Sequence, residues 1–183
     1  RETAYAIHDK LDLEAVGEPR SPRLTILVDL ALGHIDQWFV AKTAKYLQPF
    51  MTGLTAEALI RYDAVNPDPR VLPALKKSAV YLWNHLWLPK EQTFPYLDRE
   101  VKGEGGPTPA EDLNLLIAPM YAWIYHQTGD VAYRDRAVAI FARGVKKAFL
   151  GGGKQFNQNY RWSFDYVKWV TEKPKSSTSA RRK

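Results

Sequence analysis

Residues 53–87, GLTAEALIRYDAVNPDPRVLPALKKSAVYLWNHLW, predict two helices joined by a tight turn. The first helix is rich in apolar residues and runs to about Val65, where the string NPDP at 66–69 interrupts it. The second helix carries apolar side chains near helical spacing, at Val71, Leu75, Ala79, Leu82 and Leu86. This hairpin is the unit from which we predict the rest of the fold.

A second segment of the same length, residues 115–149, follows the same pattern at a shift of 62 residues. Its turn is Thr128-Gly129-Asp130, and Asp130 aligns with Asp68. Three further pairs align without a gap: Leu54 with Leu116, Leu59 with Tyr121, and Leu75 with Ala137. Two helical hairpins of one length, with an Asp at the same place in each turn, predict a repeated architecture.

The rest of the chain extends this array. Residues 2–16 and 21–44 predict a first hairpin, and a last helix is expected over about 160–170. Residues 88–110 are irregular, with a short strand at 93–97 and a helix start at Thr108-Pro109. We therefore predict an all-α array of antiparallel helical hairpins with about seven helices. It forms one domain over residues 1–171, followed by a disordered, basic, Ser-rich tail over 172–183.

Charge and composition exclude several classes of protein. The tail holds five Lys or Arg and one Glu, so it supplies +4 of the net charge of +6 and leaves the body nearly balanced. Nucleic acid is therefore not expected as a partner of the folded part. The chain contains no cysteine and no apolar run of membrane-spanning length. It begins with Arg1 inside a predicted helix, so we expect a fragment or a processed form.

Three groups of residues carry a resemblance to a known superfamily. They are Gln48-Pro49-Phe50-Met51 before the helix 54–60, the turn 128–130 with Tyr133, and Phe94-Pro95-Tyr96. With these features, residues 1–171 resemble the six-hairpin toroid superfamily, the α/α barrels of many glycoside hydrolases and polysaccharide lyases. The chain has three hairpins and a final helix where a full toroid has six. A half toroid, an open arc and an independent array all remain open.

The resemblance implies an inner ring of first helices and an outer ring of second helices, with a saccharide groove at one rim. Residues 46–53, 88–110 and 151–160 would gather at that rim. The implied partners are a polysaccharide or oligosaccharide and the missing remainder of a larger chain. A secreted or periplasmic location is favoured.

The long loop supplies the candidate catalytic residues, Tyr96 and Asp98. Glycoside hydrolysis needs two carboxyl groups at the scissile bond, whereas a uronate lyase needs a base such as Tyr or His. The alternative is a solvated loop whose acids only favour a helix start.

Substrate-binding candidates are residues that can contact sugar hydroxyls, sugar carboxylates or ring faces. They are Arg99, Gln155, Asn157, Gln158, Tyr160 and His34. The alternative for 155–162 is that Asn159 caps the last helix and Trp162 packs in the core, with Tyr166 and Trp169. The four histidines show no zinc-type spacing, so we expect no metal and no cofactor.

Two functions remain open at this point. The first is a carbohydrate-active domain that binds and cleaves a polysaccharide, as a glycoside hydrolase or polysaccharide lyase would. It predicts that Tyr96, Asp98, Asn157 and Tyr160 converge on one cleft. The second is a non-catalytic helical-repeat module that binds a protein. It predicts that these loops are apart and that apolar exposure lies along the helices.

Overall fold

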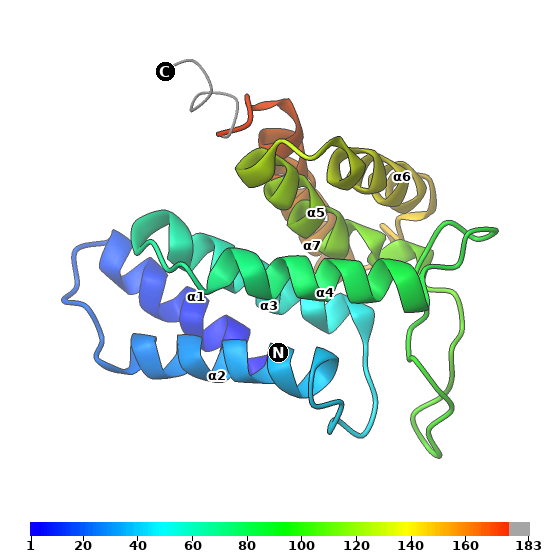
Figure 1. Ribbon diagram of the computed structural model, residues 1–183, viewed down its shortest axis with the longest axis horizontal. Helices are drawn as coiled ribbons and strands as arrows, with labels where there is room; N and C mark the ends of the chain where they lie inside the picture. The colour runs from blue at the N-terminus through cyan, green and yellow to red at the C-terminus, as the bar shows by residue number, and fades with distance from the viewer. Residues whose placement is uncertain (176–183) are drawn as a thin grey trace.

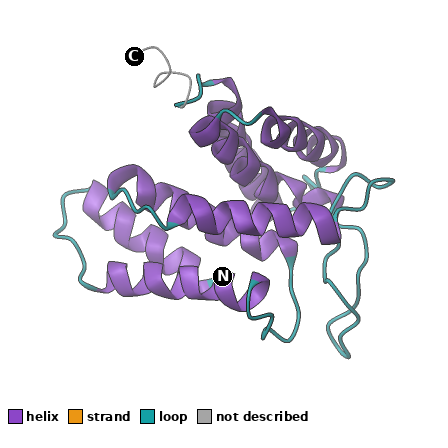
Figure 2. Cartoon of the chain, in the orientation of Figure 1, coloured by secondary structure: helices purple, strands orange, loops and turns teal. Residues whose placement is uncertain are grey.

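The computed structural model describes residues 1–175 and is helical through most of them (Figures 1 and 2). This part contains seven α-helices and no strand, so the prediction of an all-α hairpin array is confirmed. The helices are α1 (Glu2–Ala15), α2 (Arg23–Phe39), α3 (Pro49–Val65), α4 (Val71–Leu86), α5 (Asn114–Thr128), α6 (Val131–Lys147) and α7 (Gly153–Thr171). A 3₁₀ turn, Glu111–Leu113, precedes α5.

The first helices of the hairpins and the last helix form one row. Helix α1 packs against α3, α3 packs against α5, and α5 packs against α7. The second helices pack against this row and against one another: α2 contacts α1 and α4, α4 contacts α3 and α5, and α6 contacts α5. In Figure 1, α1 to α4 lie lengthwise beside one another, and α5 to α7 form a second group above them toward the right. The helices predicted to be inner are thus neighbours in space.

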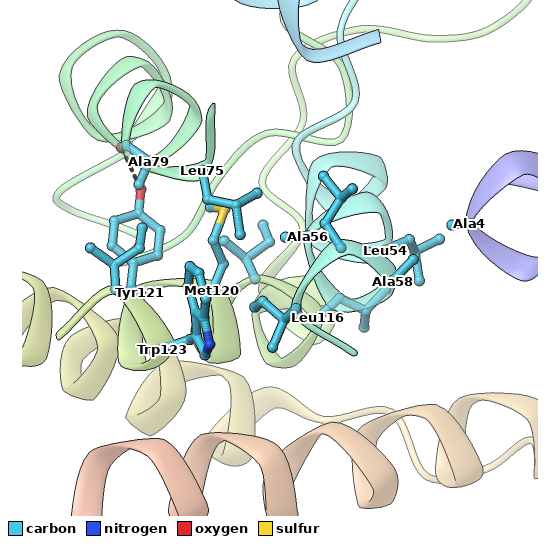
Figure 3. Packing of buried hydrophobic residues seen from close by; sticks show 14 of the residues in the cluster. Ala4, Leu54, Ala56, Ala58, Leu75, Ala79, Leu116, Met120, Tyr121 and Trp123 are labelled. Carbon is cyan, nitrogen blue, oxygen red and sulfur yellow. Dashed lines mark hydrogen bonds between the residues drawn. The ribbon is translucent and has the colours of Figure 1, made fainter. Parts of the chain in front are cut away.

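Helices α3 and α5 are the core of the row. All side chains from Thr52 to Ile60 and from Asn114 to Ile124 are buried, which requires helices that are apolar nearly all round. The two helices cross at Gly53, where an added Cβ would overlap the carbonyl oxygen of Leu116. Figure 3 shows Leu54 and Leu116, which the repeat aligns, in this region of the core.

Gly53→Ala is expected to lower the free energy of unfolding by about 1–3 kcal/mol, because the new methyl group forces two packed backbones apart. Gly33→Ala on α2 is the matched control, since no atom lies within 4 Å of a Cβ built there. It should be neutral or slightly stabilising, because Ala favours helix more than Gly does. Urea unfolding of both variants measures the difference, and equal stabilities would contradict the close crossing.

Packing between α4 and α5 adds a buried hydrogen bond. The hydroxyl of Tyr121 donates to the carbonyl oxygen of Ala79 at 2.8 Å, drawn as a dashed line in Figure 3. Tyr121 is fully buried, so its polar atom needs this partner. Burial also raises the pKa of Tyr121 well above its ordinary value.

The two turns of the repeat use the same hydrogen bond. Asp68 Oδ1 accepts from the N–H of Arg70 at 2.9 Å, and Asp130 Oδ1 accepts from the N–H of Ala132 at 3.0 Å. Each Asp therefore satisfies a free N–H at the start of the following helix. Gly129 provides the left-handed conformation, with φ 73°, that ends α5. The predicted roles of Asp68 and Asp130 as turn residues are confirmed.

Three predicted helix boundaries and one predicted strand were wrong. Helix α2 ends at Phe39 rather than Ala44, because Lys42 takes a positive φ of 52° and breaks the helix. Residues 93–97 form isolated bridges rather than a strand. The carbonyl oxygen of Thr108 accepts from Tyr96 N–H at 2.8 Å, which holds this segment in the loop, so α5 begins at Asn114. Helix α7 begins at Gly153 rather than near Tyr160.

The chain stays packed a little beyond the predicted domain end. The N–H of Lys175 donates to the carbonyl oxygen of His126 on α5 at 2.8 Å. The rest of the predicted disordered tail, residues 176–183, lies outside the described residues.

Candidate functional site

Three helices of the row each carry two polar side chains four residues apart, and the fold brings them together. A spacing of four residues places both members on one face of a helix. The pairs are His8 and Asp12 on α1, Glu57 and Arg61 on α3, and Arg161 and Asp165 on α7.

Glu57 lies at the centre of this group and is 6% exposed. Its Oε2 lies 3.5 Å from His8 Nε2, and its Oε1 contacts Arg161 Nη2 in an ion pair. Burial acts to raise the pKa of Glu57, but the hydrogen bond from His8 and the charge of Arg161 outweigh it. The pKa of Glu57 is therefore below its ordinary value, and the side chain is a carboxylate at neutral pH.

Arg61 determines the tautomer of His8. Its Nη1 lies 2.9 Å from His8 Nδ1, and a guanidinium only donates, so Nδ1 accepts. With Nδ1 as the acceptor, the ring proton lies on Nε2, which faces Glu57. Arg61 also donates through Nη2 to Asp12 Oδ1 at 2.6 Å. Helices α1, α3 and α7 are thus joined by one charged network.

An open cleft of about 630 Å³ lies over this network. We call it the polar cleft. It is lined by Asp12, Glu57, Arg61, Tyr160, Arg161, Phe164 and Asp165. The rings of Tyr160 and Phe164 are each 59% exposed, and their centroids are 4.9 Å apart. Large exposed rings beside charged groups form a surface with both apolar and polar character.

Asp165 differs from the other carboxylates of the polar cleft. It is partly buried, and among the described residues its carboxylate makes no hydrogen bond and no ion pair. Burial raises the pKa of Asp165, and the negative charge of Glu57 raises it further. Asp165 also lines a second, narrower cavity of about 110 Å³ with Glu57, next to Pro119 and Trp169. An acid of raised pKa thus shares a cleft with one of lowered pKa.

The candidate catalytic residues of the long loop lie elsewhere. The carboxylate of Asp98 accepts from the N–H of Leu47 at 2.9 Å, and Asp98 N–H donates to the carbonyl oxygen of Leu47 at 3.0 Å. Asp98 also pairs with Arg99 at 2.6 Å. Tyr96 is exposed and stacks on Phe50 with centroids 5.5 Å apart. Two of the predicted rim segments, 46–53 and 88–110, therefore meet, and their contacts hold the long loop in place.

The other candidates lie on helices. Residues 155–160 belong to α7 rather than to a loop, with Asn157 exposed and Gln158 partly buried. Within the described part of the chain, no hydrogen bond, ion pair or ring contact joins residues 156–160 to Tyr96 or Asp98. His34 lies on α2, where its ring stacks on Trp38 at 5.8 Å and partial burial lowers its pKa. Of the predicted residues with described side chains, Tyr160 lines the polar cleft.

Sequence reasoning missed five charged residues that line the polar cleft, and it missed His8, which contacts one of them, Glu57. The five are Asp12, Glu57, Arg61, Arg161 and Asp165. One signal was present, because Glu57 interrupts the run LTAEALI at 54–60 that is otherwise apolar or small. A charged residue on a core helix is rarely buried without partners. The identity of those partners, which lie about 50 and 100 residues away, has no local signature.

Neither a metal-binding cluster nor a membrane-spanning helix is found among the described residues. No group of three or more His, Asp or Glu side chains in residues 1–175 is placed to hold a metal ion. Within the same range, no helix has the length and apolar character needed to cross a membrane.

Comparison with known proteins adds no assignment. No family model matches the chain, and neither a curated protein nor a solved structure matches it.

Proposed function

We propose that this chain is a carbohydrate-active domain that binds a polysaccharide in the polar cleft and cleaves it there. The observation that supports this most directly is the pairing of Asp165 with Glu57 in an open cleft rimmed by exposed rings. The proposal keeps the predicted substrate class and moves the chemistry from the long loop to helices α3 and α7.

The opposite pKa shifts of the two carboxyl groups support glycoside hydrolysis as the reaction. One group must donate a proton to the leaving oxygen, and the other must be ionised to assist the attack at the sugar carbon. Environments that separate the pKa values of two neighbouring acids assign these roles. Asp165 is the proton donor because its pKa is raised, and Glu57 is the ionised partner because its pKa is lowered.

The rim of the polar cleft suits a sugar chain. Tyr160 and Phe164 present exposed ring faces, which pack against the apolar faces of sugar rings. Arg61 and Arg161 are donors that sugar hydroxyls can accept from.

Tyr160→Ala is expected to weaken polysaccharide binding about five- to tenfold, because the contribution of one stacked ring is about 1 kcal/mol. A glycan array identifies the ligand, and titration with that ligand gives the dissociation constants. Tyr96→Ala is the matched control, since Tyr96 is an exposed tyrosine at the long loop. It should bind like the wild type.

Either of two results would overturn the proposal. Absence of glycan binding by the wild-type chain removes the carbohydrate function. If Tyr96→Ala loses glycan binding while Tyr160→Ala binds like the wild type, the site moves back to the long loop.

A second candidate function is a protein-interaction module, favoured by apolar exposure along α7. Phe156, Tyr160, Phe164 and Val167 are all exposed and recur at helical spacing. This function also predicts that the long loop and the start of α7 are apart. In keeping with that, the Tyr96 ring stacks on Phe50, whereas the Tyr160 ring stacks on Phe156. Pull-down of a specific protein that Phe164→Asp abolishes, in the absence of any glycan ligand, would support this second function.

A further inference from the structure

The connection between α6 and α7 exposes two large apolar side chains next to each other. Phe149 and Leu150 are 54% and 58% exposed, in a short connection between Lys147 and Gly153. The ring of Phe149 lies over Gly151, where an added Cβ would be 3.0 Å from the ring. Adjacent apolar residues exposed in this way are typical of a surface that another apolar phase covers.

The apolar surface continues from this connection onto both helices. Val145 of α6, Leu150, and Phe156 and Tyr160 of α7 line a groove of about 220 Å³. The rings of Phe156 and Tyr160 stack with centroids 5.8 Å apart. Val145 and Phe156 are themselves exposed. These side chains, with Phe149, form one apolar surface.

Three lysines border this surface, Lys146 and Lys147 before the connection and Lys154 after it. All three are exposed, and within residues 1–175 none makes an ion pair or a side-chain hydrogen bond. They belong to a basic part of the chain, because residues 143–175 contain eight Lys or Arg and two Asp or Glu. The net charge of this segment is +6, whereas residues 1–142 have fifteen basic and eighteen acidic residues.

We propose that the α6–α7 connection is a docking surface for an anionic lipid bilayer. Phe149 and Leu150 enter the boundary between headgroups and acyl chains, and the three lysines contact lipid phosphates. A bilayer accepts aliphatic and aromatic side chains together without a recess of matching shape. Single-stranded nucleic acid would use stacked rings and would leave Val145 and Leu150 exposed.

The test is cosedimentation of the chain with lipid vesicles. One set contains neutral phosphatidylcholine alone, and in the other about a third of the lipid is anionic phosphatidylglycerol. The chain is expected to bind the anionic vesicles, to bind the neutral ones weakly, and to dissociate as salt is raised.

Two variants separate the apolar and the charged contributions. Phe149→Ser with Leu150→Ser is expected to lower vesicle affinity by about tenfold or more, because two large apolar side chains no longer leave water. Lys146→Glu, Lys147→Glu and Lys154→Glu together should lower it by at least about a hundredfold, because loss of each positive charge alone contributes about fivefold.

Matched controls lie on other helices. Ile26→Ser with Leu30→Ser removes two exposed apolar side chains from α2, and Lys76→Glu reverses an exposed charge on α4. Both controls should bind vesicles like the wild type.

Five results would overturn the proposal, four of them in binding experiments. The four binding results are absence of binding to anionic vesicles, equal binding to both vesicle types, an equal loss in the control variants, and binding to an oligothymidine strand in place of vesicles. Self-association that the Phe149 and Leu150 variant abolishes, without vesicle binding, would also overturn it, because a second copy would then cover the surface.

Discussion

Glu57→Ala is expected to lower the free energy of unfolding at neutral pH by about 1–3 kcal/mol, the range for loss of one partner of a buried polar contact. The substitution removes the buried centre of the charged network. It leaves His8, which is buried, and Arg161, which is half exposed, without their shared partner. This side chain links α3 to α1 through His8 and to α7 through Arg161. Urea unfolding measured by circular dichroism gives the difference from the wild type.

The effect of Glu57→Ala depends on pH in a defined direction. The pKa of Glu57 in the folded chain is below its ordinary value of 4.5, so the ionised form stabilises the folded state. This stabilisation is fully present above pH 4.5 and is lost as the pH falls through the lowered pKa. The difference between Glu57→Ala and the wild type should therefore shrink in acid.

Asp12→Ala provides the control, because Asp12 belongs to the same network at its exposed edge. Its side chain is 63% exposed and pairs with Arg61. Pairs of this kind contribute less than about 1 kcal/mol. Equal destabilisation by the two substitutions, or a Glu57→Ala effect that does not change with pH, would contradict the central position of Glu57.

Asp165→Asn is expected to lower the rate of polysaccharide cleavage by about 10²- to 10⁴-fold, the range for loss of a general acid. Asparagine has nearly the size and shape of aspartic acid but has no acidic proton to donate. The polysaccharide found by the glycan array serves as substrate, and release of reducing ends measures the rate. Binding should change little, because Tyr160 and Phe164 remain in place.

Rate against pH should be bell-shaped for the wild-type chain. The rate falls on the alkaline side as Asp165 loses its proton, and the raised pKa of Asp165 shifts this limb upward. It falls on the acidic side as Glu57 is protonated, and the lowered pKa of Glu57 shifts this limb downward. Because the two groups interact, the limbs report apparent values of the pair.

Asp98→Asn is the control for cleavage, since Asp98 is a carboxylate of the long loop that accepts from Leu47 N–H. It should leave the rate unchanged. A full rate in Asp165→Asn with a large loss in Asp98→Asn would reverse the assignment and return the chemistry to the loop.

The sequence by itself determined the helices, their hairpins and the turn chemistry. These features depend on neighbours a few residues apart: apolar spacing along a helix, the break at residues 66–69, and an Asp that accepts the N–H two residues later. The shift of 62 residues between the hairpins also follows from the sequence alone. Boundaries at Lys42 and Thr108 were wrong because a positive φ and a long-range backbone hydrogen bond ended or delayed the helices.

Only the tertiary structure decided the composition of the polar cleft. His8, Glu57 and Arg161 belong to three helices, and they meet because α1 packs against α3 while α7 packs against α5. Each pair at a spacing of four looks, in sequence, like an ordinary polar face of a helix. The two carboxyl groups then have opposite pKa shifts. Burial and the charge of Glu57 raise the pKa of Asp165, whereas contacts with His8 and Arg161 lower the pKa of Glu57 in spite of its burial. Such shifts depend on distances in the folded chain, which helical periodicity does not encode.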